Sequence, residues 1–325
     1  MTARTKLKHR RGARRTTTAA FLAAAAALAC AALAGARAAA PAPAKRTAAH
    51  GGVSLAYDTA LASAVRGEVA AGGQCGKPGD VLPAHLAFTL EGYPKPHPAP
   101  FMRPPEIQVF PVAAYRRALA ACEKEMARNI IRSSAPLSYV SDFDAHVRTL
   151  RALGADRPSP RRLDAWLRRR RVREYLKRRM PFLPMYDVSE ALRAKVAYFD
   201  FGGGQGVRFV TQYDMEDTLV SNQALAYVFQ GITDDGAYYV SAAFPIAAPF
   251  LPAEYSEEEA RRRGLESPAM PGAALRRYRK YLAENARLLE ALAPGKYRPG
   301  LGLLDDLVRS LAVDRAAMRA SLSTK

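Results

Sequence analysis

The chain has 325 residues, with 49 Lys or Arg against 30 Asp or Glu, and its formal net charge is +19. Hydrophobic residues make up 49% of the sequence, a fraction typical of a globular protein with one sizeable core. No His-Glu-x-x-His or Gly-x-Ser-x-Gly motif occurs, and no histidines are spaced as metal pairs. We therefore expect no catalytic motif, no metal site and no cofactor.

The first 38 residues have the pattern of a signal peptide. Seven Lys or Arg residues within 1–15 precede an Ala-rich apolar run at 19–35, and small residues follow it. These 38 residues carry eight of the 49 basic residues and none of the 30 acids, so the remainder has a net charge of about +11. We expect export to the periplasm or the outside. No later run of about 18 apolar residues could form a spanning helix.

Two ways of processing this segment stay open. Cys30 follows small residues as in a lipobox, although Ala27 stands where Leu is usual, and its lipidation would anchor the protein to a membrane. Ala36-Arg37-Ala38 instead offers an ordinary signal-peptidase site. Arg14-Arg15 resembles a twin-arginine signal, so the export route is also open.

Residues 39–52 are rich in Ala and Pro and are expected to form a tether, and residues 53–325 a single α+β domain. Its first expected strands are 53–57, 86–90 and 106–112. Residues 93–105 contain six prolines, which predicts an extended surface segment. Past the signal, Cys75 and Cys122 are the only cysteines, so they form either one disulfide or two free buried thiols.

Helices and then strands are expected in the rest of the chain. Apolar spacing predicts helices at 113–132, 142–153 and 161–180. Residues 195–201, 207–213, 225–233 and 237–244 are rich in Tyr, Phe and Val and are separated by glycines, which predicts an antiparallel meander. A capping box at Ser256 and Glu259 predicts a further helix, and two more are expected at 273–293 and 301–322, packed on the sheet.

The turn between the last two expected strands predicts their register. If Asp235-Gly236 is a two-residue type I′ turn, alternation places one set of side chains on a buried face and another on a more polar face. The buried set is Tyr227, Phe229, Tyr238, Val240, Ala242 and Phe244, and the polar set is Gln230, Tyr239 and Ser241.

Charge gathers in one helical segment, at about 140–180. Residues 161–179 contain ten basic and two acidic side chains. Such a helix can contact anionic lipid or an acidic envelope polymer, whereas an exported protein meets little nucleic acid. The plainer interpretation is a solvated face; no protein partner is indicated. The residues concerned are Arg168, Arg169, Arg170, Arg171, Arg173, Lys177, Arg178 and Arg179.

Polar residues of the meander suggest a second site. Arg208 and Gln212 share a strand face, and Gln230 and Tyr239 stand on the neighbouring strands, with Asp200 nearby. They could form a ligand-binding site on the sheet, or simply be polar residues on a partly wet face. The run 202–206 is glycine-rich, but a strand rather than a helix follows it, so we expect a hairpin loop and not a phosphate loop.

The strand region carries a resemblance. Residues 181–184, YFDF at 198–201, GVRFVTQY at 206–213 and FQGITDDGAYYVSAAFP at 229–245 resemble an uncharacterised group of exported bacterial proteins, several of them lipoprotein-like. The resemblance implies an envelope location and one α+β domain, and no activity. The sequence thus predicts a non-catalytic binding or structural protein of the cell envelope; the alternative is a periplasmic hydrolase or ligand-binding protein.

Overall fold

The computed structural model describes residues 44–73, 75, 81–94, 105–129, 139–169, 179–184, 189–214, 218–265 and 272–323. The predicted signal peptide and Cys30 lie outside these ranges. In the described part, no helix combines the length and apolar character needed to cross a membrane.

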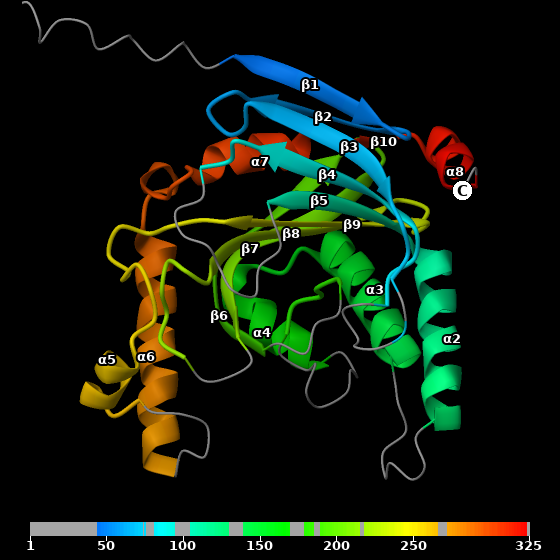
Figure 1. The fold of residues 1–325 in the computed structure, drawn as a ribbon. Helices are drawn as coiled ribbons and strands as arrows, with labels where there is room; N and C mark the ends of the chain where they lie inside the picture. The colour runs from blue at the N-terminus through cyan, green and yellow to red at the C-terminus, as the bar shows by residue number, and fades with distance from the viewer. Residues whose placement is uncertain are drawn as a thin grey trace, which may run out of the picture. The chain divides into compact units, whose positions relative to one another are not determined.

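Two antiparallel sheets and several helices make up the α+β fold that was predicted (Figure 1). The large sheet has the order β3-β4-β5-β9-β8-β7-β6 and the small one the order β1-β2-β10. The expected meander is confirmed, because β6, β7, β8 and β9 are sequential neighbours. The strands are β1 (Lys45–His50), β2 (Val53–Asp58), β3 (Ala64–Ala70), β4 (His85–Glu91), β5 (Glu106–Pro111), β6 (Ser189–Phe201), β7 (Gly204–Asp214), β8 (Leu225–Thr233), β9 (Tyr238–Pro245) and β10 (Ala312–Val313).

Helices cover both faces of the large sheet (Figure 1). On one face, α2 (Val112–Asn129), α3 (Tyr139–Asp156) and α4 (Pro160–Arg169) enclose a core with Phe209 and Tyr239. On the other, α6 (Gly272–Ala291), α7 (Leu301–Arg309) and the small sheet enclose a core with Tyr227 and Phe244. The remaining helices are α5 (Glu257–Arg262), η3 (Pro294–Lys296) and α8 (Arg315–Ser323). Since both faces are covered, every residue of β8 is buried.

The predicted register of the last hairpin is confirmed, but the turn type is wrong. Gln230 pairs with Ser241, and the two predicted sets of side chains lie on opposite faces. Of the two turn residues, only Gly236 has a positive φ, +72°, whereas a type I′ turn needs one at both. The Gly236 N–H donates to the carbonyl of Thr233 at 2.7 Å, which centres the turn on Asp234 and Asp235. The register is nevertheless the predicted one, because Ile232 pairs with Tyr239 whether the hairpin loop is counted as the four residues 234–237 or as the two residues 235–236.

Three elements differ from the prediction. Strand β1 lies inside the expected tether, where it pairs with β2 from Lys45 to His50, so ordered structure begins before Val53. Strand β3 was not predicted. The helix expected at 301–322 is interrupted, because residues 311–313 bond to the backbone of Gly202 in the β6–β7 turn. Asp314 then accepts from the N–H groups of Ala316 and Ala317 and starts α8.

The helix expected at 161–180 also differs. Helix α4 is described to Arg169, and Arg179 and Met180 are not helical. The Met180 N–H donates instead to the Glu190 carboxylate at 2.8 Å, and Pro181 follows, which disfavours helical backbone before it.

Two local predictions have clear structural counterparts. Ser256 Oγ accepts from the Glu259 N–H at 3.2 Å and caps α5, while the Glu259 carboxylate pairs with Arg262 and Arg263 rather than returning to the cap. Cys75 and Cys122 form a disulfide, with their Cα atoms 5.2 Å apart, which ties the segment before β4 to α2.

Candidate functional site

The four sheet residues predicted to form a site lie on opposite faces. Arg208 of β7 pairs with Phe229, while its neighbour Val207 pairs with Gln230. Because side chains alternate along a strand, Arg208 and Gln212 therefore point away from Gln230 and Tyr239. The prediction of one ligand site on the sheet face is wrong, since a whole layer of sheet separates its members.

The side chain of Arg208 makes its hydrogen bonds within the fold. Its guanidinium donates to both carboxylate oxygens of Asp305 in α7, at 3.0 and 2.8 Å, and to the Lys195 carbonyl. It also lies 5.5 Å from the ring centroid of Phe199 and 5.7 Å from that of Tyr227. The Tyr227 hydroxyl donates to Asp305, and burial, followed by the Asp305 charge, raises the pKa of Tyr227. This cluster anchors α7 to the sheet.

The two glutamines hold loops rather than a ligand. The Gln212 amide bonds to Leu219 and Ser221, which fixes the loop before β8. The Gln230 amide oxygen accepts from the Leu183 N–H at 3.0 Å and from the Tyr239 hydroxyl at 2.7 Å. Gln230 and Tyr239 are fully buried, so the polar face is not partly wet as predicted. All these residues serve the fold. Asp200, also placed near that site, instead forms an ion pair with Arg157.

A different place in the structure is hollow. A cleft of about 970 Å³ crosses the open edge of the large sheet at β6. Helix α4 forms one wall and α6 the other, and these helices belong to opposite faces of the sheet. The residues that matter below are Leu163, Asp164 and Arg168 of α4, Arg179, the β6 residues from Glu190 to Ala194, and Arg279, Leu282, Ala286 and Glu290 of α6.

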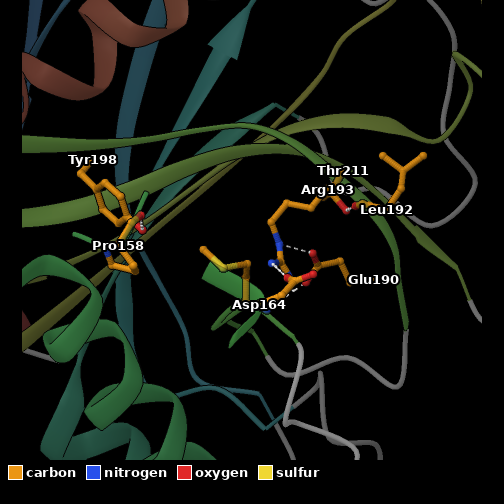
Figure 2. A network of polar contacts seen from close by, with 8 residues as sticks. Pro158, Asp164, Glu190, Leu192, Arg193, Tyr198 and Thr211 are labelled. Atoms are coloured by element: carbon orange, nitrogen blue, oxygen red, sulfur yellow. Dashed lines mark hydrogen bonds and ion pairs between the residues drawn. The ribbon is translucent and has the colours of Figure 1, made fainter. Parts of the chain in front are cut away.

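An arginine forms the inner corner of the cleft (Figure 2). Arg193 donates to Glu190 at 2.6 Å and to Asp164 at 3.1 Å, and Figure 2 shows it pointing at both carboxylates. The second Glu190 oxygen accepts from the Met180 N–H. Burial alone would lower the pKa of Arg193, but the charge and hydrogen bond of Glu190, followed by the charge of Asp164, raise it. The guanidinium is therefore permanently charged and fixed.

A bulge in β6 creates this corner. Residues three apart on a regular strand point to opposite faces, and Glu190 and Arg193 are three apart. The pairing with β7 shifts by one residue between Glu190 and Leu192, which brings both side chains to the same face. Bulges are common at sheet edges, where they re-aim side chains.

A second irregularity attaches α6 to the edge. The β6 pairing shifts again between Ala194 and Ala197, and Lys195 has φ +56°. The Lys195 N–H donates to the Glu290 carboxylate, and its Nζ to the Glu290 carbonyl at 2.6 Å. These bonds hold the second wall of the cleft against the strand.

The charges in the cleft do not balance locally. The described residues place three carboxylates in the cleft: Asp164 and Glu190 pair with Arg193, and Glu290 accepts a hydrogen bond from the main-chain N–H of Lys195. Arg168 and Arg279 are exposed on opposite walls, and neither has an ion-pair partner among the residues that the structure describes. Arg179 donates to Ser189 Oγ at 3.0 Å. The described lining thus has four arginines against three carboxylates, a net positive charge, beside the apolar side chains of Leu163 and Leu282.

The predicted basic segment is described only in part. Arg168 and Arg169 lie in α4, and Arg168 and Arg179 line the cleft. Arg170, Arg171, Arg173, Lys177 and Arg178 lie outside the described residues. The sequence offered no signal for the remaining cleft residues, since Arg193 and Arg279 are far apart in the chain and line the same cleft only because α6 packs on β6.

The described ranges contain no group of three His, Cys, Asp or Glu side chains placed to hold a metal ion. No protein-family model, no curated protein and no solved structure matches this chain.

Proposed function

We propose that this is an exported cell-envelope protein that binds an anionic ligand, without catalysis, in the cleft across the edge of β6. One observation carries the proposal: in the described part of the cleft, Asp164 and Glu190 pair with Arg193, while Arg168 and Arg279 face the cleft from opposite walls with no ion-pair partner. A ligand with negative charge and some apolar surface would satisfy both arginines and contact Leu163 and Leu282.

Export is part of this proposal. It is supported by the signal-like first 38 residues, by the resemblance of the strand region to exported proteins, and by the Cys75–Cys122 bridge, which suits an oxidising compartment. The anionic ligand of such a protein would be a component of the envelope or its surroundings. Lipidation at Cys30 would keep the protein at a membrane surface.

Binding fits the cleft better than hydrolysis. A general acid or base needs a side chain whose proton is free to move. Glu190 accepts hydrogen bonds at both carboxylate oxygens, and Arg193, with its raised pKa, cannot give up a proton near neutral pH. The carboxylates in the described part of the cleft thus hold its walls in place.

Charge reversal at the two walls tests the proposal. We compare Arg168→Glu/Arg279→Glu with Arg161→Glu/Lys280→Glu, which changes the net charge equally, takes one residue from each of the same helices and leaves the cleft lining intact. Three probes are titrated into full-length protein: phosphatidylglycerol vesicles, oligogalacturonate and an acidic hexapeptide, at about 20 and about 300 mM salt.

At least one probe should bind the parent protein, weaken with salt, and lose about tenfold or more in affinity in the cleft variant. The control variant should lose much less. Equal losses in the two variants would show that binding depends on net charge alone and would contradict the cleft as the site.

A further inference from the structure

Among the described residues, no strand pairs with the outer edge of β6 at the floor of the cleft. Strand β6 is the last strand of the large sheet. Other parts of the chain bond to this strand at two points. The Glu190 carboxylate accepts from the Met180 N–H, and the Lys195 N–H donates to the Glu290 carboxylate. Between these points, in the described part of the chain, no other element bonds to the backbone of Ala191 or Ala194. Unpaired edge groups readily accept another extended chain.

The opposite edge of the same sheet is different. Strand β3 ends the sheet there, but β1 lies against it so closely that a Cβ at Gly67 would stand 2.4 Å from the Cβ of His50. There β1 packs against a face of the terminal strand, whereas the β6 edge opens into the cleft. The small side chains of Ala191 and Ala194 on the floor, and of Ala283 and Ala286 on the α6 wall, leave room for a backbone.

Resting on the function proposed above, we propose that the anionic ligand is an extended acidic peptide segment that adds to β6 as an eighth strand. The α6 wall from Arg279 to Glu290 is about 16 Å long at the helical rise, which matches about five residues of extended chain. Peptide addition to a sheet edge combines main-chain hydrogen bonds with pockets for alternate side chains.

The two walls define the pattern of the peptide. Consecutive residues of a strand point to opposite faces, and Arg168 and Arg279 come from helices on opposite faces of the sheet. Two adjacent acidic residues would thus reach one arginine each. Two acids at alternate positions would both point to the same wall and leave the other arginine unpaired.

Charge also argues against other occupants of this edge. A second copy of the chain, paired edge to edge, would bring its own Arg168 and Arg279 against those already present. The chain's own segment 170–178 carries the same sign of charge. An acidic partner is the complement of the cleft.

The test uses two peptides of the same composition, with full-length protein and isothermal titration calorimetry. Acetyl-Thr-Val-Glu-Glu-Val-Thr-amide has adjacent acids, and acetyl-Thr-Glu-Val-Glu-Val-Thr-amide has alternate acids. The first is also made in two N-methylated forms, one modified at odd and the other at even positions. Strand addition uses the N–H groups of only one of these sets.

We expect the adjacent-acid peptide to bind at 1:1, about tenfold more tightly than the alternate-acid peptide. We expect the two N-methylated forms to differ by about tenfold or more, because only one blocks hydrogen bonds to β6. Arg168→Glu/Arg279→Glu should abolish binding, and Arg161→Glu/Lys280→Glu should not.

The other outcomes separate the two proposals. If both N-methylated forms bind equally, or oligogalacturonate or vesicles bind while the peptide does not, and binding still depends on Arg168 and Arg279, strand addition is overturned and the anionic site stands. If no probe depends on Arg168 and Arg279, the proposed function itself fails.

Discussion

Two arginines of the same meander, Arg208 and Arg193, are both largely buried but lie in different parts of the sheet. Arg208 lies on a sheet face closed by α7, where Asp305 and two aromatic rings occupy its guanidinium. Arg193 lies at the sheet edge, where it pairs with Asp164 and Glu190, and the cleft beside it is lined by more arginines than carboxylates. The difference shows that Arg208 serves the fold, and it is the reason that we place the proposed binding site where strand pairing ends.

The largest expected effect on stability is at the Arg208–Asp305 ion pair. Asp305→Ala should reduce the free energy of unfolding by about 3–5 kcal/mol, because it leaves the buried Arg208 without its counter-ion. Asp306→Ala is the matched control: its pair with Lys45 is exposed and spans 3.6 Å, so the loss should be at most about 0.5 kcal/mol. Urea unfolding measures both, and similar losses in the two variants would contradict an enclosed Arg208.

A pH effect is expected from the helical layer on the face of the sheet that α4 also covers. Desolvation lowers the pKa of His146 in α3 to about 4, helped by the charge of Arg179 and opposed by that of Asp142. The unfolded chain, with an ordinary histidine pKa near 6.5, binds the proton first. Stability is therefore complete above about pH 6.5 and falls by up to about 3 kcal/mol toward pH 4.

The variant His146→Gln isolates that contribution. Parent and variant are unfolded with urea at several pH values between 4 and 7.5. The unfolding free energy of the parent minus that of the variant should fall by up to about 3 kcal/mol as the pH falls from about 6.5 to 4. A constant difference would mean that folding does not shift the pKa of His146.

The pair at the sheet edge should cost less to break, although Arg193 and Glu190 are about as buried as Arg208 and Asp305. Glu190→Ala removes one partner of Arg193 and the acceptor for Met180, but Asp164 remains, so we expect a loss of about 2 kcal/mol. Glu284→Ala on the exposed face of α6 serves as the control, with almost no loss expected. A loss at Glu190 as large as that at Asp305 would show that Asp164 does not compensate for the missing partner of Arg193.

The smallest energetic change concerns the cleft walls. Arg168→Glu/Arg279→Glu should leave the midpoint of urea unfolding within the range of surface substitutions, because both side chains are exposed. A marked loss of stability would show that these arginines hold the fold and are not reserved for a ligand.

The sequence predicted some parts of the molecule and missed others for physical reasons. The meander and the faces of β8 and β9 followed from strict alternation around Asp235-Gly236, even though the turn type was wrong. Strand β1 was missed because its polar residues follow an Ala/Pro stretch, and only pairing with β2 makes it a strand.

The cleft was less accessible to prediction. Its corner depends on a bulge that reverses the side-chain alternation between Glu190 and Arg193, and no pattern in the residues marks that bulge. The charged segment at 161–179 was noticed, and two of its arginines line the cleft. The second wall of the cleft contains Arg279 and Glu290, which lie about a hundred residues further along the chain and reach the cleft only through packing of α6 on β6.

Hydrogen exchange with and without the adjacent-acid hexapeptide tests the proposed site most directly. The peptide should slow exchange in β6 between Glu190 and Lys195, and in the facing part of α6, while β8 and α7 are unchanged. Protection confined to β8 or α7, or no protection at saturating peptide, would contradict the assignment of the binding site to the edge of β6.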